Sequence, residues 1–77
     1  MKEKIIEIIN DVRNDIDAEN EKQLIDGEIL DSFDIVGIVG MLNEEFDISI
    51  NVNDLTPENF NSVEGMMALV ERLQQEF

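Results

Sequence analysis

The stretch that decides the fold is residues 30–46, LDSFDIVGIVGMLNEEF. Counted at about 100° per residue, its apolar side chains form one continuous arc on a helix over residues 32–46. That arc faces the core and consists of Ile35, Ile38, Val39, Leu42 and Phe46. Asp31 and Asp34 resemble a capping box, in which Glu or Gln is the more usual second residue. The sequence therefore predicts that the helix begins at Ser32.

Ser32 lies where a long connection turns into this helix. A hydroxyl at that place would project into solvent beside the free N–H groups of the helix start, where a modifying enzyme can reach it. The alternative is that Asp31 or Ser32 only caps the helix, which is the common role of these residue types. Local chemistry alone favours the cap.

The opposite side of the same helix is unusual for a surface that faces water. Apolar residues and glycines dominate it: Phe33, Val36, Gly37, Gly40, Met41 and Glu44. Glycine inside a helix costs about 1 kcal/mol relative to alanine, so two of them call for a reason. Either neighbouring segments cover this face, or it is a small docking surface where the glycines let another backbone approach closely.

Composition restricts both the size and the chemistry of the protein. The chain of 77 residues is expected to form one domain, residues 1–77, near the lower limit for a self-sufficient core. It has no cysteine and no histidine, which removes disulfides, thiolate nucleophiles, zinc–thiolate sites and the commonest general base. A chain of this size also has little room for a deep substrate pocket. These features argue against an enzyme.

Charge restricts the partners. The 19 acidic and 5 basic residues give a formal net charge of −14. That charge argues against nucleic acid and anionic membrane surfaces as partners, and favours basic protein surfaces. No apolar run is long enough to cross a bilayer, and no signal-peptide core is present. We expect a cytoplasmic monomer without membrane insertion.

Two further long helices and one short helix complete the expected fold. Residues 2–16 carry an apolar stripe, and residues 62–76 carry another behind Ser62, a candidate cap. Thr56 and Pro57 predict a short helix, with the threonine as its cap and the proline at its first position. The two stripes are Ile5, Ile8, Ile9, Val12 and Ile16, and Val63, Met66, Met67, Val70 and Leu73. The prediction is an all-α, small antiparallel bundle of three main helices plus one short helix.

The connections between these helices need anchors of their own. Residues 17–31 are too long for a structureless connection in a compact domain. Four apolar side chains can hold this segment on the helices and so fix the position of Ser32: Leu24, Ile25, Ile29 and Leu30. In the second connection, residues 47–61, Phe60 is a candidate plug for the core.

The second connection also invites comparison with a calcium-binding loop. Four residues match ligand positions of an EF-hand: Asp47, Ser49, Asn51 and Glu58. Val52, however, stands where that loop requires a glycine. The interleaved Ile48, Ile50 and Val52 suit packing better than metal binding. No stable metal site is expected.

At Asp31-Ser32-Phe33-Asp34 the chain resembles the acyl carrier protein family, in which an Asp-Ser-Leu-type motif opens the second helix. The resemblance covers most of the chain and extends through Ile35-Val36, Leu42, Glu44-Glu45-Phe46-Asp47, Thr56-Pro57-Glu58-Asn59-Phe60 and Ser62-Val63. It implies a phosphopantetheine arm on Ser32, which would supply the thiol that a chain without cysteine lacks. Such a carrier shuttles a thioester-linked acyl or aminoacyl group between enzymes and is not itself an enzyme.

The resemblance also implies partners. A phosphopantetheinyl transferase would attach the arm from coenzyme A, and an acyl- or aminoacyl-activating ligase and downstream transferases would use it. Asp31 matches the family position that helps hold Mg²⁺ during attachment, and a carboxylate oxygen suits that ion. The partner-binding face implied by the resemblance consists of Asp31, Phe33, Asp34, Val36, Gly37, Gly40, Met41 and Glu44.

Within that family, Leu30-Asp31-Ser32-Phe33 and the long second connection look closer to D-alanyl carrier proteins and stand-alone peptidyl carriers. Carriers of the fatty-acid type commonly have an acidic residue at the place of Gly37 and a methionine at that of Gly40. The cargo stays open between D-alanine, another amino acid, a fatty acyl chain and a polyketide unit. The alternative function is an acidic helical adaptor that carries no prosthetic group.

Overall fold

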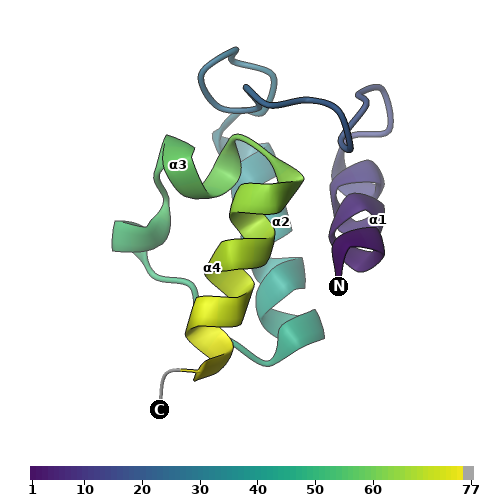
Figure 1. Cartoon of the computed structure of the whole chain (residues 1–77). Coiled ribbons are helices and arrows are strands. Elements are labelled where there is room, and N and C mark those ends of the chain that lie inside the picture. Colours follow the sequence, from purple (N-terminus) through teal and green to yellow (C-terminus); the bar gives the residue numbers. More distant parts are fainter. Residues whose placement is uncertain (76–77) are drawn as a thin grey trace.

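The computed structural model describes residues 1–75 and is helical, with no strand in that part of the chain. It contains α1 (Lys2–Val12), α2 (Ser32–Phe46), the 3₁₀ helix η1 (Val52–Asp54), α3 (Pro57–Phe60) and α4 (Val63–Gln75). In Figure 1, α1 runs opposite to α2 and α4, while η1 and α3 lie on the return path between α2 and α4. The predicted all-α bundle of three main helices and one short helix is confirmed.

Both ends of α2 are encoded by residues close to them in sequence. At its start the Asp31 side chain accepts a hydrogen bond from Asp34 N, and the Asp34 side chain accepts one from Asp31 N. At its end Asp47 adopts a left-handed conformation with φ of 53°, which is typical of a residue that terminates a helix. The predicted bounds, residues 32 and 46, are therefore correct.

The prediction that the first helix continues to residue 16 is wrong, because α1 ends at Val12. Arg13 has extended backbone dihedrals, φ −138° and ψ 104°, and its side chain bonds to Asp15 and Asp34 instead of lying along a helix surface. The following residues, Asn14 to Asp17, are mostly of the types that favour turns over helix interiors. Ile16 nevertheless packs against the core from this turn.

The core lies between α1, α2 and α4, and the two connections seal it. Its buried side chains are Ile5, Ile8, Ile9, Ala18, Leu24, Leu30, Ile38, Leu42, Phe60, Val63, Met66, Leu69 and Val70. Phe60 is 1% exposed and fills the core from α3, as predicted. Ile35, Val39 and Phe46 of the predicted arc are only partly buried and pack against this cluster. The apolar stripes thus identify most of the core correctly.

The second connection crosses the molecule between the end of α2 and the start of α4, so these two helices run in the same general direction (Figure 1). Ile48 and Ile50 pack against the core, but Val52 is 81% exposed, so its predicted packing role is wrong. The reason is a capping box of Asn51 and Asp54 that turns the chain at η1. A Cβ at Gly65 would lie 2.7 Å from Glu58 O, so glycine is needed where α4 meets α3.

No helix within residues 1–75 combines the length and apolar character needed to span a membrane.

Candidate functional site

Ser32 is the first residue of α2, and its side chain is exposed. The N-cap is Asp31, whose Oδ1 accepts a 2.8 Å hydrogen bond from Asp34 N. Asp34 Oδ2 accepts in turn from Asp31 N at 3.2 Å. The two aspartates therefore perform the capping that sequence alone could equally have assigned to Ser32. The serine hydroxyl lies at the helix start without being part of the cap.

The segment before Ser32 is anchored to the core. Leu30 is 5% exposed, and its N–H donates to Leu24 O at 2.9 Å, as does Ile29 N at 3.1 Å. Leu24 is fully buried, and its own N–H donates to Asn61 O at 3.0 Å. The predicted anchoring of this connection is confirmed, since its last residues are fixed on the core immediately before the serine.

Arg13 joins the end of α1 to this helix start. Its Nη1 donates to Asp34 Oδ2 at 3.0 Å and to Ile29 O at 2.9 Å. Its Nε and Nη2 donate to the two carboxylate oxygens of Asp15, each at 2.9 Å. The hydrogen bond from Arg13 is the main reason why the pKa of the Asp15 carboxyl lies below its usual range. The sequence pattern does not predict this role, because the contacts join residues that are 16 and 21 positions apart.

The face that sequence analysis assigned to partners divides into two parts. Phe33 and Val36 are 88% and 69% exposed, and within residues 1–75 a Cβ at Gly40 would meet no atom of another segment within 4 Å. Glu44 and the capping Asp31 are exposed as well. These five are the exposed members of the predicted partner-binding face, and we call them together the exposed surface of α2.

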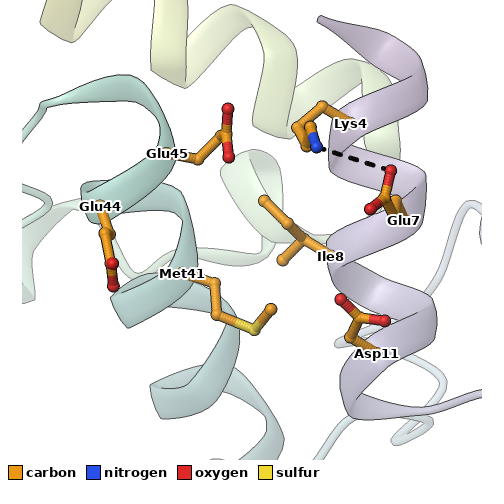
Figure 2. Close-up of a pocket in the computed structure, with 7 residues that line it drawn as sticks. All are labelled: Lys4, Glu7, Ile8, Asp11, Met41, Glu44 and Glu45. Carbon is orange, nitrogen blue, oxygen red and sulfur yellow. Dashed lines mark ion pairs between the residues drawn. The ribbon is translucent and has the colours of Figure 1, made fainter.

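The other three predicted residues, Gly37, Met41 and Asp34, are partly covered. A Cβ at Gly37 would meet a Val12 methyl of α1 at 3.6 Å. Met41 points toward Ile8 across a hollow between α1 and α2 (Figure 2). Asp34, with its side chain 13% exposed, binds Arg13. Each of these three positions therefore has a neighbouring segment beside it, and its part in partner binding stays a prediction.

The residues compared with an EF-hand have other roles. Asp47 ends α2, and Asn51 caps η1 by accepting from Asn53 N at 2.8 Å. Among residues 1–75, no group of three or more acidic side chains is placed to hold a metal ion.

The three serines of the chain differ in what their hydroxyls do. Ser62 Oγ accepts from Gly65 N at 3.1 Å and so caps α4, whereas Ser32 and Ser49 are exposed. Ser49 lies in the extended part of the second connection, and only Ser32 of these two stands at a helix start. The N–H groups of a helix start favour an attached phosphate. An exposed serine on an anchored helix start of a small acidic bundle is the arrangement expected of a carrier protein.

Comparison with known proteins agrees with that class. The chain matches the family model described as phosphopantetheine attachment site over residues 3–70. It is 36% identical over 56 residues to a probable acyl carrier protein, PigG, of Serratia sp., covering 73% of this chain and 64% of that protein. It is 28% identical over 76 residues to a D-alanyl carrier protein of Lactobacillus acidophilus, covering 97% and 96% of the two chains.

The chain therefore belongs to the phosphopantetheine-attachment family. Membership implies a phosphopantetheine prosthetic group and the role of an acyl or aminoacyl carrier, as the resemblance in its sequence led us to expect. The adaptor without a prosthetic group is correspondingly disfavoured. The residues of the helix start fit the group, because an exposed hydroxyl is available there and the chain has no thiol of its own.

Proposed function

We propose that Ser32 carries the phosphopantetheine arm. The observation that supports this assignment is the division of roles at the start of α2, where Asp31 and Asp34 cap the helix and the exposed Ser32 does not. The hydroxyl is then available to a transferase without loss of the cap. The buried Leu30 keeps the attachment point fixed relative to the core.

Attachment is a phosphoryl transfer from coenzyme A. Ser32 Oγ forms a bond to phosphorus, the phosphoanhydride bond of coenzyme A breaks, the nucleotide part leaves, and the hydroxyl proton passes to a base of the transferase. Asp31 is the exposed carboxylate next to Ser32 and would help to hold Mg²⁺ during this step. The carrier itself performs no catalysis in this proposal, and works with its transferase and ligase in the cytoplasm as a monomer.

The test is loading by a broad-specificity phosphopantetheinyl transferase with coenzyme A and Mg²⁺, followed by intact mass measurement. Wild-type protein should gain the mass of one phosphopantetheine group, and Ser32→Ala should gain none. Ser49→Ala is the matched control, because it removes another exposed serine hydroxyl and should load normally. Loading of Ser32→Ala, or failure of the wild type to load, would overturn the proposal.

We further propose that partner enzymes dock on the exposed surface of α2. It joins the apolar Phe33 and Val36 to the acidic Asp31 and Glu44, and thereby suits an apolar site with a basic rim. Val36→Lys should slow loading while leaving the fold intact. Val52→Lys is the matched control, since Val52 is also highly exposed but lies on η1. Equal loading rates for the two variants would contradict this docking surface.

We propose that the cargo is a small aminoacyl or short acyl group, with D-alanine as the first candidate. The D-alanyl carrier protein of L. acidophilus aligns over almost the whole chain. The apolar hollow between Ile25, Ile35, Leu55 and Phe60 has a volume of about 40 Å³, which holds little more than a water molecule. A long acyl chain that entered the core would have to displace side chains such as Met66, which is fully buried.

Nuclear magnetic resonance distinguishes these cargoes. Loading with D-alanine should shift only amide resonances close to Ser32, whereas a chain that enters the core would also shift the methyl groups of Met66 and Leu69. Shifts of those core methyls with a D-alanyl cargo would contradict a cargo that stays in solvent.

A further inference from the structure

All three nitrogen atoms of the Arg13 guanidinium donate hydrogen bonds. Its Nε and Nη2 bind both oxygens of Asp15 in a bidentate pair, and this pair fixes the orientation of the group. Its Nη1 is thereby directed to Ile29 O and Asp34 Oδ2. One side chain at the end of α1 thus contacts the residues on either side of the turn that leads into α2.

Asp34 Oδ2 is the oxygen that links Arg13 to the capping box. The same atom accepts from Arg13 Nη1 at 3.0 Å and from Asp31 N at 3.2 Å. Ser32 lies between the two residues of that box. Arg13 therefore holds Asp34, the residue whose carboxylate closes the turn around Ser32.

The ion pair between Arg13 and Asp34 also determines which carboxylate near Ser32 is left without a cation. Asp34 is compensated by Arg13, whereas Asp31 has no cation within ion-pair distance in residues 1–75. A carboxylate without a bound cation is the better ligand for Mg²⁺, because no arginine has to be displaced. The ion pair thus leaves Asp31 as the carboxylate able to assist attachment.

We propose that Arg13 is a positioning residue for the loading of Ser32, acting through Asp34 and the carbonyl of Ile29. The inference rests on the proposed attachment at Ser32. Without the guanidinium, the capping box loses its outer support and Asp34 becomes an uncompensated carboxylate beside Asp31. The hydroxyl is then presented less accurately to a bound transferase, while Phe33, Val36 and Glu44 of the docking surface are unchanged.

The test is the steady-state kinetics of loading with coenzyme A, the transferase and Mg²⁺. For Arg13→Gln we expect kcat to fall about tenfold while KM for the carrier stays within about twofold, the signature of lost positioning rather than lost docking. Arg13→Lys should recover only part of kcat, because an ammonium group cannot bind Asp15 bidentately and reach Asp34 as well. Melting temperatures and the Asp31 and Asp34 amide resonances of each variant report the fold and the capping box separately.

Lys22→Gln is the matched control. It removes one positive charge and a 2.6 Å ion pair with Glu64 of α4, leaves the contacts of Arg13 in place, and should load with wild-type kcat. A double-mutant cycle with Asp34→Asn tests the route, because two residues that act through one contact should not lose more together than the larger single loss.

Wild-type kcat in Arg13→Gln, additive losses in the cycle, or a change confined to KM would overturn the role of Arg13. The proposed function fails independently, through loading of Ser32→Ala. If Ser32→Ala is inert and Arg13→Gln loads as the wild type does, only the role of Arg13 is wrong.

Discussion

The starts of α2 and η1 are built alike but lead to different surroundings. In each, an Asx residue caps the helix and an aspartate three residues later accepts from its backbone N–H: Asp31 with Asp34, and Asn51 with Asp54. In each, that aspartate also binds an arginine from another helix or helix end. Asp34 binds Arg13 at 3.0 Å, and Asp54 binds Arg72 at 3.1 Å.

The chain takes a different course after each capping box. After the first, Ser32 and Phe33 are exposed at the start of a long helix. After the second, the chain runs through the short α3 into Phe60, which is buried in the core. The same type of ion-paired turn therefore exposes Ser32 at the start of α2, whereas after η1 it leads to Phe60, which fills the core. Each capping box fixes the direction of the chain, and the residues that follow it determine whether that part of the chain is exposed or buried.

Two phenylalanine substitutions test this contrast most strongly. Phe60→Ala should lower the free energy of unfolding by about 3–5 kcal/mol, the usual cost of a large core truncation, and so remove much of the stability of a small domain. Phe33→Ala should change it by less than about 0.5 kcal/mol, because exposed side chains contribute little to stability. Urea denaturation measures both. A comparable loss in Phe33→Ala would show that the start of α2 is also a core element.

The two regions differ in how far sequence could predict them. The start of α2 was predictable because its capping box and its apolar arc are both local signals. The exposure of Val52 was not, because a short alternating stretch predicts packing while the box of Asn51 and Asp54 turns the chain outward. The end of α1 and the role of Arg13 depend on contacts between residues far apart in sequence, and the periodicity of apolar residues does not predict such contacts.

The partner-binding face shows the same limit in a single helix. Periodicity correctly places Gly37 and Gly40 away from the core arc of α2. It cannot tell that a Cβ at Gly37 would meet Val12 of α1 while a Cβ at Gly40 would meet nothing. Only the position of a second helix separates the covered residue from the exposed one.

Substitutions of Asp34 and Asp54 test the difference between the two capping boxes, with a smaller expected effect on stability than that of Phe60→Ala. Asp54→Asn keeps an acceptor for Asn51 N but loses the charge that binds Arg72, so unfolding should become easier by about 1 kcal/mol. Loading at Ser32 should be unaffected by it. Asp34→Asn should instead slow loading, because its capping box surrounds the serine. Equal loading rates for the two variants would remove the functional distinction between the boxes.

Acid titration isolates the charge of Asp54. The hydrogen bond from Arg72, followed by that from Asn51 N, holds the pKa of the Asp54 carboxyl below its usual range. Its contribution to stability is therefore complete above the unfolded pKa, at about 4, and is lost as pH falls through the lower folded pKa. The stability difference between wild type and Asp54→Asn should stay constant near neutral pH and narrow below about pH 4. Chemical denaturation at a series of pH values measures this difference, and a gap that widens in acid would contradict the pairing.

Salt should have the smallest effect, and its sign depends on which charges matter. All five basic side chains pair with carboxylates, and added salt weakens such pairs. The remaining acidic groups give the net charge of −14, and salt relieves their mutual repulsion. Because exposed pairs contribute only about 0–1 kcal/mol each, we expect the second effect to prevail, so the melting temperature should rise by a few degrees with added sodium chloride.

A variant separates the two contributions to that salt response. The double substitution Glu44→Gln and Glu45→Gln removes two exposed acidic charges of α2 that belong to none of the ion pairs formed within residues 1–75. It should melt higher than wild type at low salt and respond less to salt. A melting temperature that falls with salt in the wild type would mean that the ion pairs together, those of Asp34 with Arg13 and Asp54 with Arg72 among them, outweigh the repulsion of the acidic surface.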